Sequence, residues 1–112
     1  MIIRSKDQQK TTTSHGKYIK RVILGEDLIP SLLQFAYSEF KRGDIIEKHS
    51  HESMAEVFYI LKGKLEIVIG NHSDTAEKDD CIVVRAGEQH SLNILEQTKI
   101  IYFNICDENS DT

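Results

Sequence analysis

Several short stretches of the chain alternate between apolar and polar or small side chains with a period of two residues. The pattern runs from Leu33 to Ser38 and again from Leu65 to Ile69. Successive side chains of a strand point to opposite faces, so this alternation predicts a sheet with one buried face. Further runs are rich in β-branched and aromatic residues: YIKRVIL from Tyr18, EVFYIL from Glu56, CIVV from Cys81 and KIIYFNI from Lys99. These runs favour additional strands.

Turn signals separate these runs at short, regular intervals. They are Gly25-Glu26-Asp27, Arg42-Gly43-Asp44, Lys62-Gly63, Gly70-Asn71, Asp79-Asp80 and Ala86-Gly87. Lys62-Gly63 lies between two apolar runs and predicts a two-residue hairpin, because glycine tolerates the positive φ that such turns require. No window of helical length carries an apolar stripe with a 3.6-residue period. Many short strands with regular turns predict an all-β fold, an antiparallel sandwich or barrel.

The length of 112 residues suits one compact domain. Residues 1–14 are polar and without periodicity, which predicts a flexible arm or a single edge strand. The acidic residues from 107 to 112 predict a frayed tail, so the domain is expected to span residues 15–106. Cys81 and Cys106 are too few and too far apart for a disulfide framework, and we expect both to be reduced core residues.

The charge pattern narrows the expected partners. Fourteen basic and eighteen acidic side chains give a net charge of -4, and the basic residues are scattered along the chain. Nucleic acid is therefore not an expected partner. No apolar run is long enough for a signal peptide or a membrane-spanning helix, so we expect a cytoplasmic protein without a membrane partner.

The candidate chemistry begins with His49 and His51, which stand one residue apart in strand-like sequence. On one strand they would project two imidazoles from the same face, a chelating arrangement. The chain can then turn and bring Glu56 beside them. Two nitrogens with a carboxylate suit divalent Fe, Mn, Ni, Zn or Co. The alternative is a pair of exposed polar residues on a solvated face. Glu47 shares their parity and is a candidate acid/base residue, unless a bulge leaves it in solvent.

The stretch from residue 43 to residue 63 resembles the first motif of the cupin superfamily, whose members are also called RmlC-like. That motif is a glycine, five residues, H-x-H, four residues, a glutamate, six residues and a glycine. Its fixed positions are filled by Gly43, His49, His51, Glu56 and Gly63. The later stretch DDCIVVRAGEQHSLN resembles the second motif at Gly87 and His90. It departs from that motif where Asp79 replaces a glycine, Arg85 replaces a proline and Asn93 falls one residue early. These departures put the turns and the pocket rim in doubt.

The resemblance implies a small single-domain cupin, an antiparallel jelly-roll β-barrel also described as a double-stranded β-helix. It further implies that one divalent metal ion is held on the inner face by His49, His51, Glu56 and His90. Three histidines and one carboxylate leave open coordination positions for water, substrate or dioxygen. Cupins pair as dimers, so the resemblance also implies a homodimer.

Other residues are candidates for binding a small-molecule ligand. Phe58 shares the parity of Glu56 and is expected to wall the pocket, unless it is ordinary core. Arg85 precedes the His90 strand, where a guanidinium can hold a carboxylate or phosphate, although a solvated turn residue is the alternative. Tyr37 and Tyr102 are candidates to supply phenol groups to the cavity. The sequence does not show whether their side chains lie on the same face of their strands as the metal.

The two remaining histidines are expected to be solvated rather than ligands. His15 lies in the polar arm and His72 in the turn GNHSD.

The resemblance implies an enzyme that acts on a small polar metabolite, of the sugar/uronate or keto acid isomerase, lyase or dioxygenase type. The same four ligands serve each of these reactions, so the sequence does not choose among them. The alternatives are a metal that only braces the barrel, a non-catalytic ligand-binding or metal-sensing module, and an interaction scaffold. Because histidines protonate, any bound metal is expected to leave as the pH falls below about 6.

Overall fold

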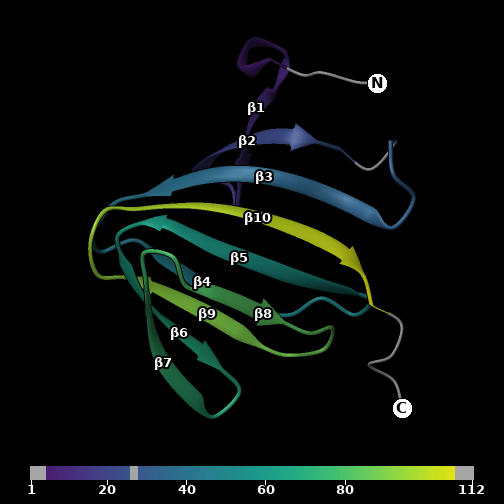
Figure 1. The fold of residues 1–112 in the computed structure, drawn as a ribbon. Helices are drawn as coiled ribbons and strands as arrows, with labels where there is room; N and C mark the ends of the chain where they lie inside the picture. The colour runs from purple at the N-terminus through teal and green to yellow at the C-terminus, as the bar shows by residue number, and fades with distance from the viewer. Residues whose placement is uncertain (1–4, 26–27, 108–112) are drawn as a thin grey trace.

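The computed structural model describes residues 5–25 and 28–107, which form two antiparallel β-sheets and one short 3-10 helix (Figure 1). The elements are η1 (Lys6–Gln8), β1 (Lys10–Ser14), β2 (Tyr18–Leu24), β3 (Leu32–Phe40), β4 (Ile45–His49), β5 (Met54–Lys62), β6 (Lys64–Ile69), β7 (His72–Glu77), β8 (Cys81–Val84), β9 (His90–Ile94) and β10 (Thr98–Cys106). One sheet has the order β1-β2-β3-β10-β5-β8 and the other β4-β9-β6-β7. The predicted all-β jelly-roll fold is confirmed.

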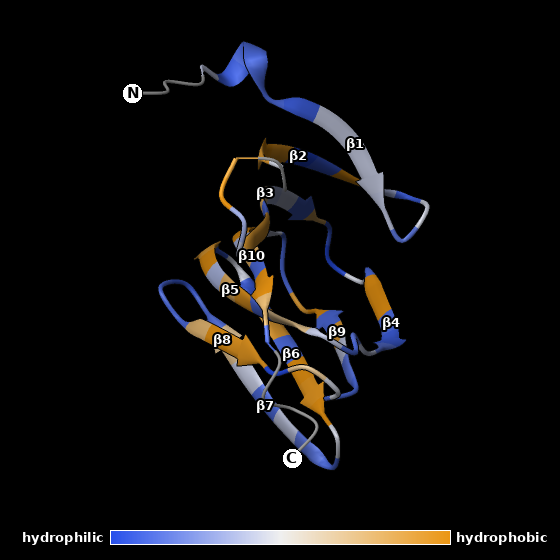
Figure 2. Ribbon diagram, turned by 90° about the vertical axis from the view of Figure 1, so that its right-hand side faces the viewer, coloured by the Kyte–Doolittle hydropathy of each residue, from blue (hydrophilic) through white to orange (hydrophobic). Residues whose placement is uncertain are grey.

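The hydrophobic core lies between the two sheets. Ile60 and Ile100 come from the six-stranded sheet, whereas Leu65 and Leu92 come from the four-stranded sheet, and all four are almost fully buried. The apolar strands that supply this core are orange in Figure 2. Burying one such side chain stabilises the fold by about 1.5–3 kcal/mol. The alternation seen in the sequence therefore reflects one face of each strand turned to the facing sheet.

Gly63 marks the point where the chain passes from one sheet to the other. β5 pairs with β10 and β8, whereas β6 pairs with β9 and β7. The predicted hairpin at Lys62-Gly63 is therefore wrong, because the two apolar runs belong to different sheets. Gly63 has a φ of +97°, and a Cβ atom there would lie 2.7 Å from the Cα of Thr98 and closer still to the carbonyl oxygen of Gln97. Only glycine fits this corner without displacing the start of β10.

Two of the four edge strands, β7 and β1, are more polar than the central strands. β7 was not predicted, because its sequence HSDTAE is polar and only Ala76 is buried. It lies at the edge of the four-stranded sheet, where a single partner strand is enough to hold it. β1 comes from the polar amino-terminal segment and lies at the edge of the six-stranded sheet, paired with β2. Both strands are held by backbone hydrogen bonds to their neighbours and not by the burial of an apolar face.

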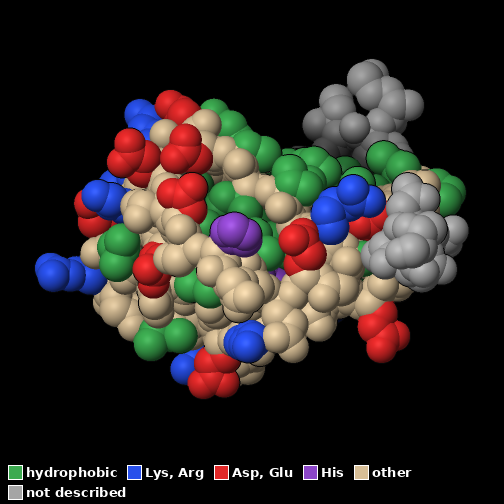
Figure 3. Space-filling view, turned by 90° about the horizontal axis from the view of Figure 1, so that it is seen from below, with side chains coloured by type: hydrophobic (Ala, Val, Ile, Leu, Met, Phe, Trp, Pro, Cys, Tyr) green, Lys and Arg blue, Asp and Glu red, His purple; other side chains and the backbone are tan. Residues whose placement is uncertain are grey.

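Both cysteines are free and exposed, so the expectation that they lie in the core is wrong. Cys81 begins β8 in register with Tyr59, and Cys106 ends β10. Of the predicted acidic tail, Asp107 is buried, and residues 108–112 lie outside the described residues. Within residues 5–25 and 28–107, no helix is long and apolar enough to cross a membrane. Figure 3 shows acidic and basic side chains intermixed over the face that it presents.

Candidate metal centre

Four side chains, three from the two sheets and one from a loop, converge at one end of the core. His49 ends β4 and lies in register with His90 at the start of β9, while Glu56 projects from β5 in the other sheet. His51 comes from the loop between β4 and β5. One donor atom from each of these residues lies within 4.8 Å of the donor atoms of the other three. The structure therefore brings together the four residues that the sequence predicts as ligands.

His51 reaches the group from a loop and not from a strand. β4 ends at His49 after a register shift between Ile46 and His49, so the prediction that the two histidines share one strand is wrong. The backbone N–H of Gly87 donates to the carbonyl oxygen of His51 at 2.7 Å. This bond fixes the loop against the connection before β9, and the ring centroids of His49 and His51 lie 5.2 Å apart.

The spacing of the donor atoms fits a single metal ion. Glu56 Oε1 lies 3.2 Å from His51 Nε2 and 3.0 Å from His90 Nε2. Two ligand atoms that are each about 2.1 Å from one ion, at right angles, would be about 3.0 Å apart. The site thus needs little rearrangement to bind an ion.

Backbone carbonyl groups orient two of the imidazoles. His49 Nδ1 lies 2.8 Å from the carbonyl oxygen of Glu47, and His90 Nδ1 lies 3.1 Å from that of Glu88. A carbonyl oxygen only accepts, so each Nδ1–H donates and each Nε2 is turned toward the centre. Oriented nitrogens of this kind are typical of metal ligands in proteins.

Electrostatics keep the carboxylate ionised. Glu56 is 6% exposed, and burial opposes its ionisation, but the hydrogen bond from His90 and the nearby histidines lower its pKa overall. Burial likewise disfavours charge on His90, but the bonds to Glu56 and to the Glu88 carbonyl raise its pKa overall. The pKa of His49 is lowered, chiefly by burial. The proton on His90 Nε2 is the one that a metal ion would displace.

A cavity of about 50 Å³ is lined by three of the four residues, His49, Glu56 and His90. Its lining consists of Ser14, His15, Phe40, Ile46, His49, Glu56, Phe58, His90, Leu92, Ile100 and Tyr102. Two residues predicted to bind substrate, Phe58 and Tyr102, are therefore beside the centre, with ring centroids 5.6 Å apart. Burial raises the pKa of Tyr102 to about 12, against the effect of the Ser38 hydroxyl, so the phenol stays protonated. It can donate a hydrogen bond but is a poor base.

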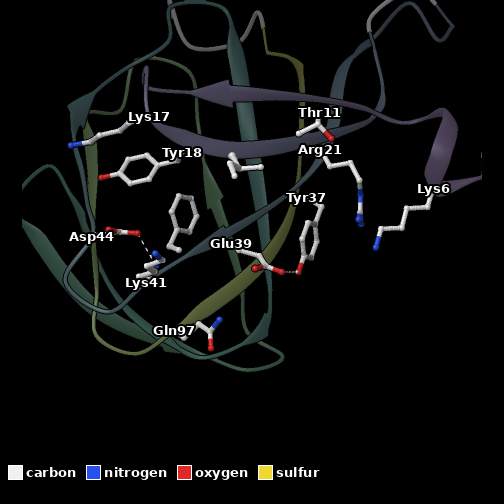
Figure 4. A pocket seen from close by; sticks show the side chains of 12 residues that line it. Lys6, Thr11, Lys17, Tyr18, Arg21, Tyr37, Glu39, Lys41, Asp44 and Gln97 are labelled. Atoms are coloured by element: carbon white, nitrogen blue, oxygen red, sulfur yellow. Dashed lines mark hydrogen bonds between the residues drawn. The ribbon is translucent and has the colours of Figure 1, made fainter.

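Three other predicted site residues do not line this cavity. Glu47 is exposed, and the bulge in β4 separates its side chain from the centre. Tyr37 lies in a different hollow of about 680 Å³, where its phenol donates to Glu39 Oε1 at 2.6 Å (Figure 4). Arg85 binds Asp107 through Nε at 2.7 Å and through a terminal nitrogen at 2.8 Å. Their catalytic and substrate-binding roles stay predictions that this placement does not support.

The departures from the second motif have local structural explanations. Asp79 keeps a left-handed backbone, with a φ of 72°, at the motif's glycine position, a conformation that aspartate tolerates better than most residues. Arg85, at the proline position, ties the loop before β9 to the end of β10 through Asp107. Asn93 is exposed and donates to Glu66 Oε1 at 2.9 Å. None of these three side chains lines the cavity.

His15 is exposed, as expected, but it also lines the cavity, a position that sequence reasoning missed. Its ring centroid is 4.7 Å from that of His49. The only local signal is the His15-Gly16 pair, which is typical of a tight turn but does not show what the turn faces. His72 is exposed on β7 and does not line the cavity.

The cupin domain profile matches residues 36–106, more than half of the chain and all four candidate ligands. The chain belongs to the cupin family. No curated protein sequence matches this cupin significantly.

Solved structures similar to this cupin share its fold at low sequence identity. KdgF from Halomonas sp. is 17% identical with a TM-score of 0.76, over 96% of this chain and 95% of that one. The cupin domain of Schizosaccharomyces pombe Cnp3 is 18% identical with a TM-score of 0.78, over 95% and 74%. A predicted oxalate decarboxylase from Thermotoga maritima is 17% identical with a TM-score of 0.76, over 95% and 99%. At these identities the likeness establishes the fold alone.

Proposed function

We propose that this cupin is an enzyme that acts on a small polar metabolite through one divalent metal ion, of the Fe, Mn, Ni, Zn or Co class. The observation that carries the proposal is the convergence of His49, His51, Glu56 and His90, whose donor atoms lie within 4.8 Å of one another. Three imidazoles and one carboxylate brought this close together form a donor set that is typical of divalent metal centres. The donor set is therefore best explained by metal binding.

The residues around the centre define what it can do. A bound ion would supply Lewis-acid polarisation, or redox chemistry if it is iron or manganese, at positions left open by four protein ligands. Phe58, Leu92 and Ile100 form apolar walls that exclude water. Tyr102 would donate a hydrogen bond to a substrate oxygen. The ion and Tyr102 would bind the polar groups of a small substrate, and the apolar walls would contact its carbon atoms.

The expected charge of the metal centre indicates the class of substrate. Three neutral imidazoles and one carboxylate leave a divalent ion with a net positive charge, which favours an anionic substrate. The similar structure from Thermotoga maritima is described as a predicted oxalate decarboxylase, which supports including small carboxylates among the candidates. Uronates and keto acids, acted on by an isomerase, lyase or dioxygenase, meet the same requirement.

The second candidate is a non-catalytic cupin that binds a small ligand or senses a metal. The cavity lining favours it, because Glu47 lies outside the cavity and Tyr102 stays protonated near neutral pH. A proton-transfer enzyme needs a base within reach of its substrate.

Metal analysis of purified variants tests the proposal. Wild type is expected to bind one equivalent of metal, His51→Ala to lose most of it, and the control His72→Ala to retain it. Equal retention by both variants would contradict the metal centre. Loaded wild type is then assayed against unsaturated uronates, small keto acids and oxalate. Metal binding without turnover of any of them would favour the non-catalytic candidate.

A homodimer is proposed as the assembly, with the outer face of the six-stranded sheet as its interface. Tyr59, Leu61 and Val83 are exposed on this face, and Val83 is 53% exposed. Phe35, Phe103 and Val57 form a cross-strand row that continues to Val83. An apolar face of this kind can bury itself against a second copy by two-fold symmetry.

The free thiols support a cytoplasmic location, which is likewise proposed.

A further inference from the structure

We infer that His15 is a ligand-positioning residue, which forms a hydrogen bond to a small anion bound at the open side of the metal centre. This inference rests on the proposed metal site. It adds to that site a side chain from outside both cupin motifs.

A tight turn presents His15 to the centre. The N–H of Lys17 donates to the carbonyl oxygen of Ser14 at 3.1 Å, which closes the turn between β1 and β2. The two central residues, His15 and Gly16, have φ values of 51° and 74°. Positive φ at both positions is the geometry of a type I′ turn, and for histidine it is uncommon. The backbone conformation is therefore one that directs this side chain away from the strand axis.

Tyr18 anchors the turn against the body of the protein. Its phenol donates to the carbonyl oxygen of Ile45 at 2.7 Å, and its ring packs edge-on against Phe40 with centroids 5.3 Å apart. Tyr18 is buried and belongs to the hydrophobic core. Because Tyr18 follows His15 by only three positions, this anchor limits how far the His15 ring can move from the centre.

The His15 ring lies at the cavity next to the candidate ligands. Ser14 and His15 bound the cavity on the hairpin side, whereas His49, Glu56 and His90 bound it on the other. His15 lines the cavity and is also exposed to solvent. An imidazole carries at least one N–H in either protonation state, so the ring can donate a hydrogen bond to an anion.

His15 is not a fifth metal ligand. The group whose donor atoms lie within 4.8 Å of one another consists of His49, His51, Glu56 and His90 alone among the described residues. His15 lies outside this group, and its ring is edge-on to that of His49. A metal-bound anion is the ligand that this arrangement would recognise.

The experiment uses the full-length protein loaded with Co²⁺ and titrated with azide as the probe anion. Visible absorption of the cobalt reports azide binding, and metal analysis reports cobalt content. His15→Phe keeps a ring against His49 but removes both nitrogens, His15→Gln restores a donor, and His72→Phe is the matched control. We expect equal cobalt content in all four proteins and azide binding weakened about tenfold in His15→Phe, the loss of one hydrogen bond to a charged group. His15→Gln should recover part of that loss, and His72→Phe should bind azide as wild type does.

Several outcomes would overturn the assignment. They are wild-type azide affinity in His15→Phe, no recovery in His15→Gln, no azide binding by cobalt-loaded wild type, and loss of cobalt from His15→Phe, which would make His15 a metal ligand. A wild-type protein that binds no cobalt would instead refute the metal site itself. The failure of this inference is thus distinguishable from the failure of the proposed function.

Discussion

Substitution of the corner glycine tests whether the crossing between the sheets depends on close backbone contact. Gly63 and Gly43 both have positive φ, at 97° and 90°, but a Cβ atom overlaps its surroundings only at Gly63. Alanine in a left-handed conformation costs about 1–2 kcal/mol at either position. Overlap with backbone atoms of Gln97 and Thr98 adds about 1–3 kcal/mol, as other overpacked sites do. We therefore expect Gly63→Ala to lose about 2–5 kcal/mol and Gly43→Ala about 1–2 kcal/mol.

Urea unfolding followed by circular dichroism measures both losses in metal-free protein. Because about 1 kcal/mol changes the Tm of a domain of this size by roughly 4 °C, thermal unfolding should separate the two variants clearly. Asparagine tolerates the left-handed conformation better than alanine, so Gly63→Asn and Gly43→Asn isolate the overlap if Gly63→Ala does not fold. Equal losses at the two positions would refute the reasoning, because they would show that the corner relaxes at no cost.

Four further predictions concern the effect of pH on metal affinity and on stability, the loop before β9, and assembly. The pKa of His90 is raised above 6.5, so a proton should compete with the metal for this histidine at a higher pH than for an ordinary one. As the pH is lowered, metal affinity should therefore begin to fall while the pH is still above 6.5, and not only near the value of about 6 expected from the sequence. Competition with a chelator at several pH values measures this affinity. In metal-free protein, the lowered pKa of Glu56 gives stability that is present above pH 4.5 and lost as the pH falls through that pKa. The raised pKa of His90 gives stability that is present below pH 6.5 and lost as the pH rises, so urea unfolding should show this pair's largest contribution between pH 4.5 and 6.5. Arg85→Ala should lower the Tm and Arg85→Lys should restore it only in part, because an ammonium does not match the two-point contact with Asp107; an unchanged Tm in Arg85→Ala would contradict this. Val83→Glu should convert a dimer to a monomer in light scattering, and a wild-type monomer would remove the proposed interface.

The apolar strands could be predicted from the sequence because their side chains are the core. β10 alternates buried and less buried positions along most of its length, and β8 begins and ends where the run CIVV does. β7 could not be predicted, because its pairing is made by backbone groups that every residue carries. The Gly63 turn was misassigned because local sequence does not show which strands become partners.

The ligand set was predictable for a different reason. His49, His51 and Glu56 lie close together in the sequence, at fixed distances from one another and from Gly43 and Gly63. This local motif can be recognised without knowledge of the fold. His15 was not predictable, since it lies 34 positions before His49 and only the fold brings the two rings together. Long-range contacts of this kind leave no local pattern.

Glu56 belongs to one sheet, whereas His49 and His90 belong to the other. An ion coordinated by all three would act as a cross-link between the layers, much as a disulfide does between two segments. The rate at which the two sheets separate on unfolding would then depend on the metal concentration, because the ion must first dissociate. In a cell short of that metal, the protein would be degraded sooner, so its abundance would follow the availability of its own cofactor.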